Sequence, residues 1–121
     1  MMPYEKLKAW QSCHRLVLAT YKATQTFPKT EIYGLTSQMR RAAFSAAANV
    51  AEGAAKRGPK EFRRFLDIAL GSLSEMSYAI LLVKELGYVS EGDWKELDLL
   101  RQEAGKLTWG LYRLICSKAG D

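Results

Sequence analysis

The stretch that decides the fold is PKEFRRFLDIALGSLSEMSYAILLVKELG, residues 59–87. Its apolar side chains recur at steps of four and three: Phe62, Leu66, Ala69, Leu73, Met76, Ile80 and Val83. Because a helix turns once every 3.6 residues, this spacing predicts a long helix with one buried stripe. Pro59 suits the first helical position, where its missing amide donor would be unpaired anyway, and Gly87 suits the end.

Upstream of it, a first helix is indicated by residues at the same spacing: Leu7, Trp10, His14, Val17 and Tyr21. This helix should end near Phe27 and Pro28, because proline disfavours a helical conformation in the residue before it. Residues 29–35, which include Gly34, are interpreted as a connecting loop.

A second helix is expected to begin near Thr36 or Ser37, since either hydroxyl can accept a hydrogen bond from a first-turn amide. It should end around Lys56-Arg57-Gly58. Its inner face is unusually small, which lets a neighbouring backbone approach closely: Met39, Ala43, Ala46, Val50 and Gly53. Phe44 points away from that face and suggests contact with another subunit.

Ser90 and Asp93 form a helix start, because the serine can cap a free amide and the aspartate favours the positive helix end. A fourth stripe follows: Trp94, Leu97, Leu100, Ala104, Leu107, Leu111 and Leu114. Four helices of about 20–28 residues would each run roughly 30–40 Å. Joined by short loops, they predict one all-α domain over residues 1–121, an antiparallel up-down-up-down four-helix bundle.

Charge is distributed unevenly along the chain. The net charge is +5, and residues 1–66 hold 12 Lys and Arg against 4 Asp and Glu, whereas residues 67–121 hold 6 against 9. A surplus of eight in the first part and a deficit of three in the second suit either a basic binding face or charge-complementary self-assembly.

The basic run at residues 56–64 is the strongest functional signal, and Glu61 is the only acid inside it. Arginine matches phosphate oxygens bidentately, and clustered cations gain affinity by releasing counterions from a nucleic acid. Arg40 and Arg41 extend this surface, as do Lys6, Lys8 and Arg15. We therefore expect a nucleic-acid-binding face made of Arg40, Arg41, Lys56, Arg57, Lys60, Arg63 and Arg64. The alternative is a solvated helix end.

Four aromatic side chains are candidates for stacking on unpaired bases: Tyr4, Trp10, Tyr33 and Phe44. Positions in the core or in a subunit interface are the favoured interpretation of most of them.

Asn49, Glu52 and Glu75 lie beside core positions and are interpreted as a structural polar cluster, with Arg41, Ser45 or Ser72 as their partners. Di-metal sites in bundles use Glu-x-x-His motifs, and the chain has a single histidine, so no metal and no cofactor are expected. His14 is interpreted as a packed residue. No nucleophile–base set is recognisable, so we expect no catalytic residues and no enzymatic activity; a site around the polar cluster is the less favoured alternative.

Two cysteines, Cys13 and Cys116, cannot form a disulfide framework of the secreted type, which favours a reducing compartment. The opening MMPYEKLKAW has no apolar signal core, and no uninterrupted apolar run reaches membrane-spanning length. A cytoplasmic location without a membrane partner is the expectation.

Residues 27–76, FPKTEIYGLTSQMRRAAFSAAANVAEGAAKRGPKEFRRFLDIALGSLSEM, resemble the four-helix-bundle family encoded in intervening sequences of bacterial 23S ribosomal RNA genes. The motifs that carry the resemblance are FP, YGLTSQ, RRA, NVAEG at 49–53 and FLDIALGSLSE, together with YEKLKAWQ, LVLATYKATQTFP and ELGY at 85–88. They cover nearly the whole chain. Ala47 stands where the family often has proline, which should leave the second helix straighter.

That family is in turn similar to accessory proteins of diversity-generating retroelements, five-subunit barrels whose basic surface contacts nucleic acid and a reverse transcriptase. The resemblance implies a homopentamer, with a reverse transcriptase or another protein as a further partner. The predicted function is non-enzymatic binding of nucleic acid, RNA rather than DNA. The alternative is a protein scaffold that forms a ring without nucleic acid, in which the basic half of one subunit meets an acidic stretch of another: Glu91, Asp93, Glu96 and Asp98.

Overall fold

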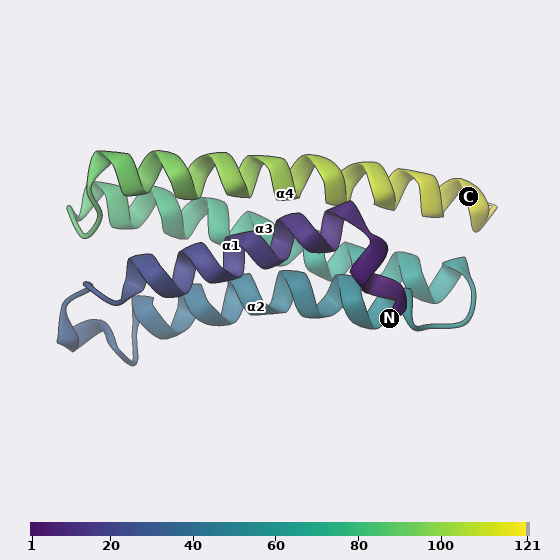
Figure 1. Cartoon of the computed structure of the whole chain (residues 1–121), viewed down its shortest axis with the longest axis horizontal. Coiled ribbons are helices and arrows are strands. Elements are labelled where there is room, and N and C mark those ends of the chain that lie inside the picture. The colour runs from purple at the N-terminus through teal and green to yellow at the C-terminus, as the bar shows by residue number, and fades with distance from the viewer. Residues whose placement is uncertain (121) are drawn as a thin grey trace.

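The chain folds into four long helices. A computed structural model, which describes residues 1–120, contains α1 (Lys8–Thr24), α2 (Leu35–Ala54), α3 (Pro59–Glu85) and α4 (Glu91–Lys118), with the short 3-10 helices η1 (Pro3–Lys6) and η2 (Lys29–Glu31). No strand occurs in the described residues. Each helix reverses the direction of the one before it (Figure 1), and every helix packs against its two neighbours in the order α1, α2, α3, α4 and back to α1. The predicted all-α four-helix bundle is confirmed.

One hydrophobic core joins all four helices. The predicted stripe of α3 is buried apart from the half-buried Phe62, and all five residues of the predicted inner face of α2 are buried. Full burial of one such aliphatic side chain contributes roughly 1.5–3 kcal/mol. An exposed ion pair such as Arg15–Glu103 contributes about 0–1 kcal/mol, so packing stabilises the bundle far more than surface charge does.

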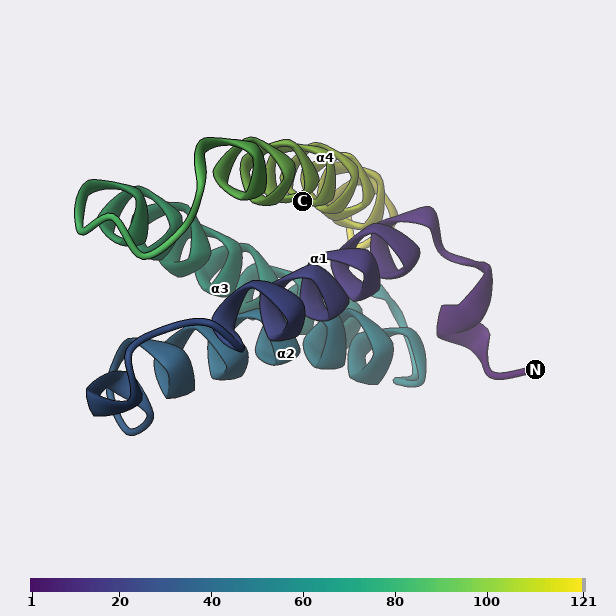
Figure 2. The same cartoon turned by 60° about the vertical axis from the view of Figure 1, so that its left-hand side comes forward.

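The predicted stripe of α1 lies at the margin of the core, against which Leu7, Trp10 and Val17 pack. Leu7, Trp10 and Val17 are half-buried and Tyr21 is exposed, whereas the buried side of α1 carries smaller residues: Ala9, Ser12, Cys13, Leu16, Thr20 and Thr24. The two threonines are tolerated inside because their hydroxyls donate to the carbonyls of Leu16, at 2.7 Å, and of Thr20, at 2.8 Å. The larger side chains therefore lie in an outer groove between α1 and α2, which run side by side in Figures 1 and 2.

Three of the predicted helix boundaries are close to those observed. The Ser90 hydroxyl accepts a hydrogen bond from the Asp93 amide at 3.1 Å and caps α4 as predicted. Gly58 and Gly87 adopt φ values of 87° and 75°, which side chains disfavour, at the α2–α3 and α3–α4 turns. α2 also runs without a break through Ala47, where the related family often has proline.

The predicted start of α2 is within one residue of the observed one, but the predicted cap is wrong. The helix begins at Leu35, and neither Thr36 nor Ser37 caps it. Instead the Glu31 carboxylate accepts from the Leu35 amide at 3.1 Å, and its other oxygen accepts from the Tyr88 hydroxyl at 2.8 Å. A side chain four residues upstream thus replaces the expected cap and ties η2 to the α3–α4 turn.

Among the described helices, α3 alone has the length and apolar content of a membrane span, with a mean hydropathy of 1.5 over its most apolar window. In this fold the apolar stripe of α3 supplies one wall of the core instead.

The closest approach of α2 to α3 is expected to make Gly53 sensitive to substitution. A Cβ atom at Gly53 would lie 2.8 Å from Cβ of Phe65 and 2.9 Å from Cδ1 of Phe62, whereas at Gly71 it would meet no atom of residues 1–120 within 4 Å. Overpacking costs roughly 1–3 kcal/mol, and alanine recovers about 1 kcal/mol of helix propensity. Urea denaturation should therefore show Gly53→Ala less stable than the parent, by up to about 2 kcal/mol.

Gly71→Ala is the matched control, because it changes a helical glycine that faces open space. It should be neutral or stabilising by up to about 1 kcal/mol. Equal stability of the two variants would contradict the close α2–α3 contact.

Candidate nucleic-acid interface

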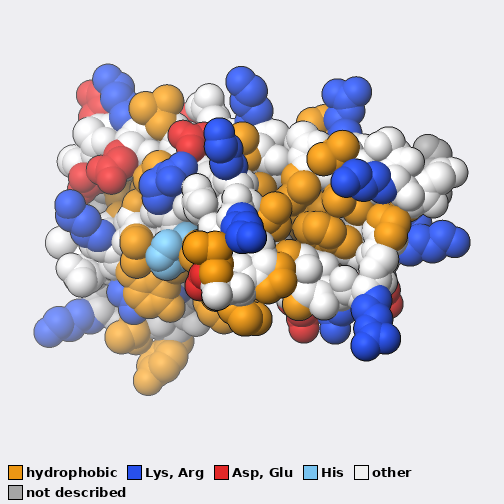
Figure 3. Space-filling view, turned by 45° about the vertical axis from the view of Figure 1, so that its right-hand side comes forward, with side chains coloured by type: hydrophobic (Ala, Val, Ile, Leu, Met, Phe, Trp, Pro, Cys, Tyr) orange, Lys and Arg blue, Asp and Glu red, His pale blue; other side chains and the backbone are white. Residues whose placement is uncertain are grey.

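The turn between α2 and α3 presents the basic run. α2 ends at Ala54, Gly58 reverses the backbone and α3 begins at Pro59. Lys56, Arg57 and Lys60 are exposed there, and no carboxylate in the described part of the chain lies within ion-pair distance of them. Cationic side chains project from this end of the molecule, at the right of Figure 3, with hydrophobic side chains between them.

The other two residues of the run are partly engaged. Nε of Arg64 lies 2.9 Å from the Glu61 carboxylate, and the Arg64 guanidinium lies 4.6 Å above the ring of Phe65. Arg63 is half-buried. A hydrogen bond with Cys116 is the largest cause of the raised pKa of Tyr112 in α4. The positive charge of Arg63 opposes this rise, so the Arg63 side chain lies near α4.

The seven predicted binding residues form two groups rather than one face. Arg40 and Arg41 lie 15 or 16 residues before Lys56 on α2, a separation of about 24 Å along the helix. Nε of Arg40 donates to the Thr24 hydroxyl at 2.8 Å, and Arg41 forms a 2.6 Å ion pair with Glu75 of α3.

The antiparallel topology adds cations that are distant in sequence from the run. The N-terminal segment and the C-terminal end of α4 both lie toward the end of the bundle that holds the α2–α3 turn (Figure 1). Arg113 and Lys118 of α4 were not predicted, although the up-down-up-down order would have indicated them. We call this surface the basic end; its residues are Lys6, Lys8, Lys56, Arg57, Lys60, Arg63, Arg64, Arg113 and Lys118.

The predicted polar cluster is corrected by the structure. Asn49 donates to the Ser45 carbonyl at 2.8 Å and to its hydroxyl at 3.1 Å, and Ser72 donates to the same hydroxyl at 2.9 Å. Glu75 is exposed and pairs with Arg41, whose guanidinium also donates to Gln38.

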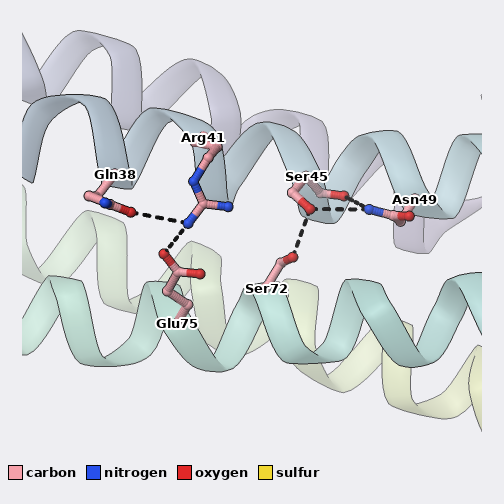
Figure 4. Close-up of polar contacts among 6 residues, drawn as sticks. All are labelled: Gln38, Arg41, Ser45, Asn49, Ser72 and Glu75. Carbon is pink, nitrogen blue, oxygen red and sulfur yellow. Dashed lines mark hydrogen bonds and ion pairs between the residues drawn. The ribbon is translucent and has the colours of Figure 1, made fainter. Parts of the chain in front are cut away.

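Glu52 is exposed and takes no part in this network. The polar residues line the seam between α2 and α3 (Figure 4), where Glu75 is exposed and paired with Arg41, so they are not a buried charge cluster. We call this row of residues the polar seam: Gln38, Arg41, Ser45, Asn49, Ser72 and Glu75.

Two opposite faces of the bundle are apolar. A groove of about 660 Å³ runs between α1 and α2, and one of about 440 Å³ runs between α3 and α4. Phe44, 61% exposed, lies in the first groove and Tyr78, 66% exposed, in the second. The residues of the first groove are mostly small or aromatic: Met2, Tyr4, Trp10, His14, Val17, Phe44, Ala47, Ala48, Ala51, Glu52 and Ala55.

Of the four aromatic residues singled out from the sequence, none is in the core. Tyr4 and Trp10 are half-buried in the α1/α2 groove, whereas Tyr33 and Phe44 are exposed. His14 stacks on Trp10 at a ring distance of 4.9 Å, as a packed residue would.

Reactive groups are few in the described residues. No three His, Cys, Asp or Glu side chains there gather closely enough to hold a metal ion. Cys13 is fully buried, with its sulfur 3.6 Å from the Thr108 hydroxyl. Burial raises the pKa of the Cys13 thiol to about 11, and the contact with Thr108 only partly offsets this. The thiol is therefore protonated at neutral pH and is a poor nucleophile.

A family model described as "23S rRNA-intervening sequence protein" matches residues 5–110. The chain belongs to this family. The match spans the four helices up to Gly110 in α4 and includes the basic run and both apolar faces.

A solved structure with a similar fold supports this assignment of the fold. It is a protein of unknown function from the S23 ribosomal protein family of Bacteroides thetaiotaomicron, with 19% sequence identity and a TM-score of 0.76. The similarity covers 86% of this chain and 97% of that one. No curated protein matches the chain.

Burial of Cys13 should make stability depend on alkaline pH. The thiol titrates near 9 when exposed and near 11 in the fold, so folding favours its protonated form. That contribution is present below pH 9 and is lost as the pH rises toward 11. Between pH 8 and pH 10, denaturant titration should show the parent losing about 1 kcal/mol more stability than Cys13→Ala. Identical losses in the two proteins would contradict a desolvated thiol.

Proposed function

We propose that this family member is a non-enzymatic RNA-binding homo-oligomer whose basic end contacts phosphate groups. The observation that carries the proposal is the turn at Lys56, Arg57 and Lys60, where three exposed cations have no carboxylate partner among residues 1–120. Cations without such partners are available to a phosphate backbone, and each contact releases a condensed counterion. Exposed arginine also forms bidentate bonds to phosphate oxygens.

RNA is favoured over DNA by the family description, which refers to an intervening sequence of 23S rRNA. The contacts available at the basic end are made to phosphates, so binding should follow the shape and charge of the RNA more than its base sequence.

Self-association is supported by the two apolar faces. Contiguous exposed apolar surface on a soluble bundle marks an interaction site. Because the α1/α2 and α3/α4 faces lie on opposite sides and differ in composition, we infer a head-to-tail contact between copies, which closes into a ring when the rotation allows it. The homopentamer implied by the family resemblance is such a ring. In a ring whose symmetry axis is parallel to the helices, the basic ends of all subunits lie on the same rim. One RNA can then contact several subunits at once, which raises its overall affinity.

The rival is a ring that serves as a protein scaffold without nucleic acid, held by charge between the basic end and the acidic start of α4. It predicts that raised salt dissociates the oligomer itself and that RNA has no effect. Apolar interfaces predict the opposite response, since salt screens charges and leaves apolar contacts intact.

Neutralising the three cations of the α2–α3 turn that have no carboxylate partner among residues 1–120 should weaken RNA binding. We expect Lys56→Gln, Arg57→Gln and Lys60→Gln together to lower the affinity for a structured RNA and to reduce the slope of log K against log salt by about 2–3, since about one counterion is released per contact. Fluorescence anisotropy at 50–200 mM salt measures both quantities.

The matched control is Lys22→Gln, Lys29→Gln and Lys106→Gln, which lowers the net charge equally but leaves the basic end intact. The control should retain most of the affinity and the slope. Equal losses in the two triple variants would move the binding site elsewhere, and RNA that never binds the parent would favour the scaffold.

A further inference from the structure

A pocket lies at the start of α2, about 24 Å from the basic end along the helix. Its volume is about 350 Å³, and it opens between the end of α1, the η2 loop and the first turns of α2. It is lined by Tyr21, Ile32, Thr36, Ser37, Arg40, Arg41 and Phe44. Hydroxyl and guanidinium groups thus meet aromatic rings in one pocket.

Hydrogen-bond donors in this pocket are unused. The Thr36 side chain is only 6% exposed, and its hydroxyl has no hydrogen-bond partner among residues 1–120. Glu31 accepts from the amide of Leu35, and the Gly34 carbonyl accepts from Gln38. The two backbone amides between Leu35 and Gln38, those of Thr36 and Ser37, have no acceptor in the described chain. Among the described residues, Arg101 Nε is the only fully buried side-chain nitrogen or oxygen without a partner, so the Thr36 hydroxyl is reachable from the pocket and can donate to a ligand or to water.

The two arginines of the pocket are held in place by other contacts. Arg40 uses Nε to bond Thr24, and its guanidinium lies 4.7 Å above the ring of Tyr21. Its two terminal nitrogens make no hydrogen bond to the described residues. Arg41 is oriented by Glu75 and Gln38. A preorganised guanidinium loses less conformational freedom when it binds an anion.

We propose that this pocket binds a phosphate group, through the amides of Thr36 and Ser37, the Thr36 hydroxyl and the terminal nitrogens of Arg40. The positive end of the α2 dipole and the arginine favour an anion at this position. Glu31 is the opposing charge, and its two oxygens already accept from Leu35 and Tyr88.

The role of the pocket within RNA recognition rests on the proposed function. One strand of a duplex places a phosphate about every 3.4 Å, so about seven nucleotides span the distance from the pocket to the basic end. One RNA of that length or more can occupy both sites. A shorter ligand carrying a phosphate, such as a nucleoside monophosphate, can occupy the pocket alone.

The test follows the amide resonances of Thr36 and Ser37 by ¹H–¹⁵N NMR. Inorganic phosphate should shift both signals saturably, whereas chloride at equal ionic strength should not. Arg40→Gln and Thr36→Val should each weaken phosphate binding about tenfold, as expected when one good contact is lost. Lys106→Gln, which lies outside both the pocket and the basic end, should leave the phosphate titration of Thr36 and Ser37 unchanged. Unchanged signals elsewhere in the spectrum show that each variant is folded.

A second titration uses an unphosphorylated single-stranded RNA of about twelve nucleotides, longer than the span between the sites. Shifts at Thr36, Ser37 and the basic end together support the pocket as part of the RNA-binding surface. Shifts with phosphate but not with RNA support a pocket for free phosphate or a phosphomonoester.

The pocket proposal is overturned if phosphate leaves both amides unmoved or if chloride moves them equally. It is also overturned if dilution alone moves them, because the pocket would then belong to a subunit interface. RNA that shifts only the basic end upholds the proposed function without the pocket. RNA that shifts neither region overturns the proposed function, and the phosphate titration still decides the pocket.

Discussion

The close contact between α2 and α3 is the constraint on which the rest of the structure depends. The inner face of α2 is made of alanine, glycine and a few larger apolar residues. At Gly53 the two helices meet so closely that a Cβ atom would overlap the side chains of Phe62 and Phe65 on α3. Phe44, Tyr78 and Trp109 lie outside the core, on the surfaces of α2, α3 and α4.

The outer faces of the bundle differ in character. The α1/α2 and α3/α4 faces are apolar grooves, whereas α2 and α3 meet at the polar seam, and the Arg15–Glu103 ion pair joins α1 to α4. Opposite apolar faces suit contacts between copies, which leaves the ends of the bundle for other partners. One end holds most of the basic residues because of the topology: the α2–α3 turn, the N-terminal segment and the end of α4 all lie toward it.

The sequence predicted the helices and the cap that follow from local residue spacing. It did not predict which face of a helix packs against which neighbouring helix. The α3 stripe, the α2 inner face and the Ser90 cap follow from spacing and residue type. Spacing also revealed a stripe on α1, but it could not show that Thr20 and Thr24 would face the core and the aromatics the groove. The cap of α2 was missed for a related reason, because Glu31 reaches forward from η2 to accept from the Leu35 amide.

The same division holds for the candidate interface. The run at 56–64 is contiguous and was found, whereas Arg113 and Lys118 join it only through the antiparallel order, and the separation of Arg40 and Arg41 from it follows from helix length. Phe44 lies in the α1/α2 groove, and the exposed Leu81 lies in the α3/α4 groove. Head-to-tail contact through these two apolar faces is the central claim, and light scattering of Phe44→Glu and Leu81→Glu variants tests it most directly. Each variant has one damaged face and should be monomeric alone, and an equimolar mixture should form a heterodimer through the remaining intact pair of faces. A mixture that stays monomeric, or a single variant that keeps its full assembly, would contradict the account.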